Sequence, residues 1–149
     1  MTNIEDAKRD NQDPEECLRP IALEAEAFLL SQKWCEKIDS GFVERAWANV
    51  LGVFYFRFKP SHGVPPDVWI VVGDIPPAYF DTRHCKTGED ALWSYISRMR
   101  DWVKAVRKGR STAKLIPVLA RDSYEPVNAT TEIVDGLASR LKFIEKHML

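Results

Sequence analysis

The feature that most constrains the fold is a run of apolar residues that ends in a glycine, an acid and two prolines. Residues 69–80 read WIVVGDIPPAYF. The first four residues are apolar without alternation, which indicates a strand buried on both faces. Gly73 and Asp74 favour a turn, and Pro76 and Pro77 supply no backbone N–H, so the chain is expected to leave the strand along a rigid path. This pattern constrains the fold more than it constrains a chemistry.

A second strand is predicted just before this run. Residues 51–59 are dense in aromatic and β-branched side chains. Alternation places Phe54, Phe56 and Phe58 on one face, which we expect to lie against the core. Residues 60–67 have the composition of a loop, so 51–59 and 68–73 are predicted to form an antiparallel hairpin. A lone hairpin is only marginally stable, and residues 46–50 and 116–119 are the candidates for a third strand.

Helical spacing of apolar residues predicts three main helices, at about 20–39, 88–108 and 131–147. Gly41 suits the end of the first helix. Thr87 and Asp90 resemble a capping box before the second, and Thr130 or Thr131 caps the third. The predicted fold class is therefore α+β, with the helices packed on one side of a small antiparallel sheet.

Length and composition favour one globular domain. A chain of 149 residues can bury a core, and residues 13–149 are expected to form it, after a polar, flexible segment at 1–12. No apolar run approaches the roughly 20 residues that span a bilayer, and the first residues lack the pattern of a secretion signal. Three cysteines without a repeated spacing favour free thiols. We therefore expect a cytoplasmic protein that does not enter a membrane.

One resemblance follows from these residues. Residues 69–79 look like the central strand and exit of an uncharacterised bacterial family of hypothetical proteins, the DUF4826-like group, and residues 73–77 are the distinctive part. Helices of that family are also similar to residues 91–103 and 137–145, so the likeness covers about residues 45–149. The resemblance implies a bacterial, intracellular protein of one domain. It brings no activity and no functional residue with it.

Three residues are candidates for chemistry. Asp74 follows a strand end, where functional groups often lie, and it is expected either to act as a cation ligand or base, or to bond backbone donors of its own turn. His84 and Cys85 are residue types of zinc sites and of nucleophile–base pairs. The chain has no C-x-x-C or H-E-x-x-H spacing, no glycine-rich phosphate loop and no nucleophile elbow. We therefore assign no catalytic residue, no metal site and no cofactor.

Basic residues gather near the end of the second long helix. A basic cluster of this kind is the footprint of nucleic-acid binding, but the sequence pI is about 6.3 and the formal net charge is −1, unlike a nucleic-acid binder. Cations at a helix C-terminus also complement the helix dipole. Nucleic-acid binding is therefore disfavoured. The cluster comprises Arg98, Arg100, Lys104, Arg107, Lys108, Arg110 and Lys114.

The favoured hypothesis is a non-catalytic protein-interaction module, such as an immunity, inhibitor or adaptor protein. Five tryptophans are many for this length, and exposed aromatic side chains are typical of interface hot spots. The alternative is a small-molecule enzyme of unrecognised class that uses Asp74, His84 and Cys85 in one cleft. The sequence leaves the partner, the substrate and the oligomeric state open. The predicted binding residues are Asp74, Tyr79, His84, Cys85 and Trp93, with Glu24 and Glu36 as further interface candidates.

Overall fold

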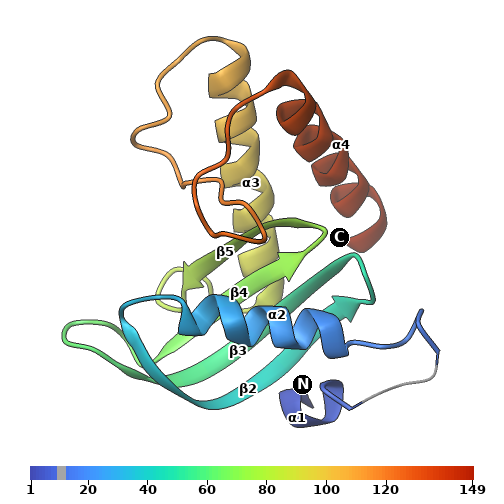
Figure 1. Cartoon of the computed structure of the whole chain (residues 1–149), viewed down its shortest axis with the longest axis vertical. Coiled ribbons are helices and arrows are strands. Elements are labelled where there is room, and N and C mark those ends of the chain that lie inside the picture. The colour runs from blue at the N-terminus through green and yellow to red at the C-terminus, as the bar shows by residue number, and fades with distance from the viewer. Residues whose placement is uncertain (10–12) are drawn as a thin grey trace.

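The fold is a five-stranded antiparallel sheet with helices on both of its faces, in a computed structural model that describes residues 1–9 and 13–149 (Figure 1). The strands follow one another across the sheet in chain order, from β1 to β5. This arrangement confirms the predicted α+β class with a small antiparallel sheet. The strands are β1 (Thr2–Asn3), β2 (Cys35–Trp47), β3 (Leu51–Pro60), β4 (Asp67–Gly73) and β5 (Ile75–Asp81). The helices are α1 (Ile4–Ala7), α2 (Arg19–Leu30), α3 (Gly88–Arg107) and α4 (Thr131–Met148).

The central hairpin is formed by β3 and β4, with Phe54 opposite Ile70. This pairing confirms the hairpin predicted at 51–59 and 68–73. Phe54, Phe56 and Phe58 are buried in one core together with residues of α2, as their alternation predicted. The additional strand predicted at 46–50 is in part the end of β2, whereas residues 116–119 contribute only a single bridge from Leu119 to Pro126.

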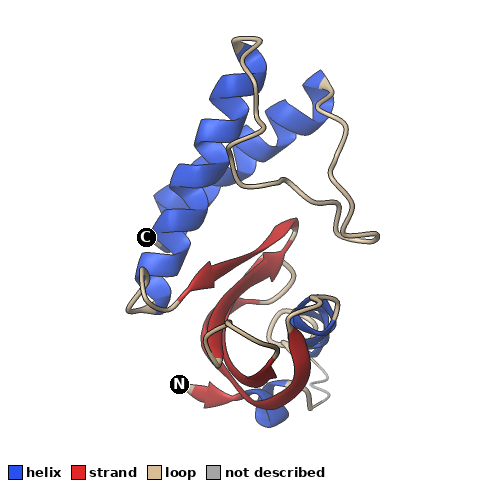
Figure 2. Ribbon diagram, turned by 90° about the vertical axis from the view of Figure 1, so that its left-hand side faces the viewer, coloured by secondary structure: helices blue, strands red, loops and turns tan. Residues whose placement is uncertain are grey.

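Helices cover both faces of the sheet, whereas the sequence predicted them on one side. One core contains α2 with the phenylalanine face of β3, and a second core contains α3 and α4 with the opposite face. Figure 2 shows the strands curling around α2, with α3 and α4 on the outer side. The cause lies in β4, where every residue from Val68 to Gly73 is buried. A strand that is apolar on both faces has to be covered twice.

The first long helix ends earlier than the predicted boundary at residue 39. It stops at Leu30, and the chain enters β2 at Cys35. Shifts in the pairing of β2 with β3 interrupt the alternation of buried residues along β2, and such bulges hide a strand from pattern analysis. Gly41 is not a helix stop. It lies in β2 where an added Cβ would come 2.5 Å from the Phe56 ring, so only glycine leaves room for that ring.

The chain after Gly73 returns as a strand, although the sequence predicted a rigid exit. Asp74 forms the turn, its N–H donates to the carbonyl of Val50 at 2.9 Å, and β5 then pairs with β4. Pro76 and Pro77 are tolerated because β5 is an edge strand and because its pairing with β4 is shifted between Ile75 and Ala78, so that neither proline has a regular ladder partner. The double proline therefore marks a sheet edge.

Both termini of the chain contribute to the fold. Thr2–Asn3 pairs with β2, and Ile4 and Ala7 are buried against it. This places the start of the predicted flexible segment 1–12 against the sheet, and its residues 10–12 lie outside the described residues.

The capping signals act as predicted: Thr87 Oγ1 accepts from the Asp90 N–H at 3.1 Å, and Thr130 caps α4. Among the described residues, no helix has both the length and the apolar character needed to cross a membrane.

The turn at Gly73 gives a test of this fold. Gly73 has φ = 144°, and an added Cβ would lie 2.3 Å from the Val50 carbonyl oxygen. Gly73→Ala is expected to lower the free energy of unfolding by about 2–5 kcal/mol, since backbone strain and overpacking combine. Gly63→Ala is the matched control, because Gly63 also has positive φ but nothing lies within 4 Å of its added Cβ. It should cost about 1 kcal/mol. Equal losses in urea unfolding of the two variants would contradict the tight turn.

Candidate functional site

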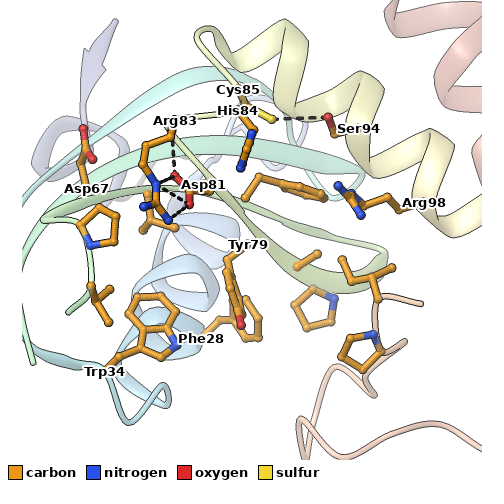
Figure 3. Close-up of a pocket in the computed structure, with 18 of the residues that line it drawn as sticks. Phe28, Trp34, Asp67, Tyr79, Asp81, Arg83, His84, Cys85, Ser94 and Arg98 are labelled. Carbon is orange, nitrogen blue, oxygen red and sulfur yellow. Dashed lines mark hydrogen bonds and ion pairs between the residues drawn. The ribbon is translucent and has the colours of Figure 1, made fainter. Parts of the chain in front are cut away.

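A large cavity lies along the edge strand β5, and we call it the β5 cleft. Its volume is about 630 Å³, within the range of roughly 300–1,000 Å³ typical of ligand sites. Several separate parts of the chain line it around β5. They are the end of α2 with the following turn, Phe58 of β3, the loop before β4 with the start of β4, the segment from residue 81 to α3, and residues 114–119. Figure 3 shows the side chains that point into it.

An aromatic wall forms one side of the β5 cleft. The rings of Trp34 and Tyr79 meet edge to face with centroids 5.1 Å apart. Behind them, Phe58 lies 5.3 Å from Trp34 and Phe28 lies 6.5 Å from Tyr79. Phe28 and Phe58 are buried in the core, whereas Tyr79 is 46% exposed. The wall is thus an apolar surface that the fold holds rigidly from behind and leaves open to solvent in front.

The end of β5 places an acid, Asp81, at one end of the β5 cleft, and a neighbouring arginine balances its charge. The Asp81 carboxylate accepts from the Arg83 N–H at 2.8 Å and from the Arg83 guanidinium at 2.9–3.0 Å. These hydrogen bonds hold the pKa of Asp81 down at about 2. The second acid there, Asp67, accepts from the hydroxyls of Tyr55 and Thr82 at 2.8 and 2.7 Å. Both carboxylates are therefore already engaged by groups of the chain.

His84 and Cys85 both border the β5 cleft, but their side chains point in different directions (Figure 3). The His84 ring is exposed and points into the cleft. Cys85 is buried, and its Sγ lies 3.4 Å from Ser94 Oγ. The Cys85 carbonyl also accepts from Trp69 Nε1 at 2.8 Å. The surroundings of Cys85 are those of a core residue that fixes the start of α3 against β4.

Two cations that line the β5 cleft have no ion-pair partner in the described part of the chain. These are Arg98 on α3 and Lys114 in the following loop, and both are exposed. Other arginines of α3 are paired with α4: Arg100 with Glu145, and Arg107 with Asp135 at 2.7 Å. The difference leaves uncompensated positive charge in the same cleft as the aromatic wall.

The remaining predicted site residues lie away from this cleft. The Asp74 carboxylate binds Arg121 at 3.4 Å and Arg140 at 3.2 Å, whereas the sequence predicted bonds to nearby backbone donors. It lines two smaller cavities beside α4. Trp93 lies on α3 and is 42% exposed, but it does not line the β5 cleft. The structure therefore brings together Tyr79, His84 and Cys85, and separates Asp74 and Trp93 from them.

The acidic interface candidates are occupied by ion pairs. Glu24 accepts from Arg121 at 3.1 and 3.2 Å, and Glu36 pairs with Lys59 at 3.4 Å. Conversely, sequence reasoning missed Trp34, Arg98 and Lys114 as members of one site. They come from segments far apart in the chain, and no local spacing links them. No group of three or more metal-ligating side chains gathers anywhere in residues 1–9 and 13–149.

The Asp81–Arg83 contact predicts an unusual titration. Because the pKa is lower in the folded chain than in the unfolded chain, the ionised carboxylate stabilises the fold above about pH 4, and this contribution is lost as the pH falls through about 2. Carboxyl-carbon NMR should therefore give Asp81 a midpoint of about 2. In Arg83→Gln the midpoint should rise toward the ordinary range. A wild-type midpoint near 4 would show that the contact does not persist in solution.

Comparison of the chain with protein-family models, with curated proteins and with solved structures finds no match. The resemblance of residues 45–149 to the DUF4826-like group therefore stays a prediction from the residues that carry it. The function is inferred from the geometry of the β5 cleft alone.

Proposed function

We propose that this protein is a non-catalytic protein-interaction module of the immunity, inhibitor or adaptor type, and that the β5 cleft is its docking site. The observation that carries the proposal is the aromatic wall of Trp34 and Tyr79. A ring that is 46% exposed yet held by buried rings behind it costs little entropy to engage. Rigid aromatic side chains of this kind dominate the energetics of protein interfaces.

The chemistry of the cleft favours binding over catalysis. A nucleophile needs a base within hydrogen-bond reach and a group that orients that base. The Cys85 thiol instead contacts the Ser94 hydroxyl, and Asp74 is bound by two arginines elsewhere. The most perturbed acid of the cleft is Asp81, and its guanidinium partner keeps it ionised and engaged. None of these groups is poised to exchange a proton with a substrate.

The enzyme hypothesis keeps one supporting observation, because His84 and Cys85 do border the same cleft. That hypothesis requires Cys85 to be accessible, since reactive cysteines lie in partly exposed sites.

The location proposed for this module is the cytoplasm of a bacterium. All three cysteines are free thiols, and Cys35 and Cys85 are buried. Free thiols fit a reducing compartment, where disulfides rarely persist. The bacterial origin rests on the family resemblance described above.

Photo-cross-linking tests the docking site. We expect p-benzoyl-phenylalanine in place of Tyr79 to cross-link a partner protein in cells of the native host. The same group in place of Phe143 is the control, since Phe143 lies on α4 with a similar exposure of 49%. It should give no such product. A partner captured from residue 143 and not from residue 79 would place the interface elsewhere.

Alkylation distinguishes the module from the enzyme. In the folded protein, iodoacetamide should modify Cys85 more slowly than Cys17, because Cys85 is buried and Cys17 is partly exposed. Peptide mapping by mass spectrometry measures both rates in one sample. Preferential labelling of Cys85 would indicate an activated thiolate and favour the enzyme.

A further inference from the structure

We infer that the occupant of the β5 cleft is an acidic, extended segment of the partner protein, with an apolar side chain on the Trp34–Tyr79 wall and carboxylates at Arg98 and Lys114. This inference rests on the proposed function and adds the chemistry of the partner. It follows from the charge balance of the cleft, from its shape, and from the contrast with the other arginines of α3.

The charge balance shows where a ligand finds free charge. At one end of the cleft, Asp81 is neutralised by Arg83, and both oxygens of Asp67 accept from hydroxyl groups. Arg98 and Lys114 line the same cleft and have no acidic partner in the described part of the chain. A bound segment therefore meets positive charge that the fold has not compensated. Complementary charge at such a site steers association and rejects basic partners.

Two neighbouring arginines of α3 differ from Arg98 in having acidic partners on α4. Arg100 and Arg107 project from the same helix and pair with Glu145 and Asp135 on α4. Arg98 instead extends toward the cleft that also contains Tyr79 and His84 (Figure 3). The two arginines of α3 that meet α4 are thus paired with acids, whereas the arginine that extends toward the cleft is not.

The shape of the cleft favours an extended peptide. Residues 77–81 of the edge strand β5 line the cleft. The aromatic wall lies on one side of this strand, and Arg98 lies beyond its other side (Figure 3). A ligand that touches both must therefore pass across the edge strand. A short segment with one apolar and one or two acidic side chains meets this requirement. Nucleic acid fits less well, because the chain as a whole has a net charge of −1.

The test uses the full chain and a random linear peptide library displayed on phage. Peptides selected on the wild-type protein should be enriched in acidic residues beside an aromatic or aliphatic residue. The affinity of the best synthetic peptide, measured by fluorescence polarisation, should fall about tenfold or more in the double variant Arg98→Glu/Lys114→Glu. It should also weaken as the salt concentration rises.

The matched control is the double variant Lys108→Glu/Arg110→Glu. It makes the same change in net charge near the end of α3, at exposed residues that do not line the cleft. Its affinity should stay within about twofold of wild type if the effect is local to the cleft rather than due to overall charge. Circular dichroism confirms that each variant is folded.

Four outcomes would contradict the inference, and they differ in what they leave of the proposed function. Cleft-dependent peptides, lost in Tyr79→Ala, that are neutral or basic would overturn the acidic partner and leave the interaction module standing. An equal loss of affinity in both double variants would do the same. Failure to select any peptide that depends on Tyr79 would overturn both. Single-stranded oligothymidylate that displaces the peptide and depends on Arg98 would replace the acidic peptide by nucleic acid.

Discussion

The rest of the structure depends on the burial of β3 and β4 on both faces. Val68 to Gly73 are all buried, and the phenylalanines of β3 face one core while Val53 faces the other. Each buried apolar side chain contributes about 1.5–3 kcal/mol relative to its exposed state. Neither α2 nor the α3–α4 pair covers both faces of this hairpin. The sheet therefore separates two cores. Residues of both cores line the cleft along its edge strand β5.

Much of the fold could be predicted from local patterns. The hairpin and the three long helices follow from alternation, helical spacing and the caps at Thr87 and Thr130. The end of α2 and the start of β2 could not be predicted, because Cys35 and Ile38 continue the helical spacing while bulges interrupt the strand alternation. The prolines hid β5 for a related reason: propensity disfavours them in strands, and only an edge position permits them.

The candidate site was harder to predict than the fold. Tyr79, His84 and Cys85 lie close together in sequence and share the β5 cleft, so local reasoning found them. Trp34, Arg98 and Lys114 reach the same cleft from separate elements, and only the tertiary structure brings them together. From the sequence, the Asp74 carboxylate at a strand end looks available to bind a ligand. In the structure, Arg121 and Arg140 come from distant segments and form ion pairs with it.

The two prolines of β5 also affect how this edge strand can recognise a bound peptide. Neither ring offers an amide hydrogen, and the Pro76 carbonyl already accepts from the Tyr95 hydroxyl at 2.7 Å. A polypeptide that lies along the start of this edge finds few free backbone groups with which to form hydrogen bonds. The addition of a further strand by backbone pairing alone is therefore disfavoured there. Specificity at this edge therefore depends on side-chain contacts, and an extended polypeptide without matching side chains is not expected to bind there.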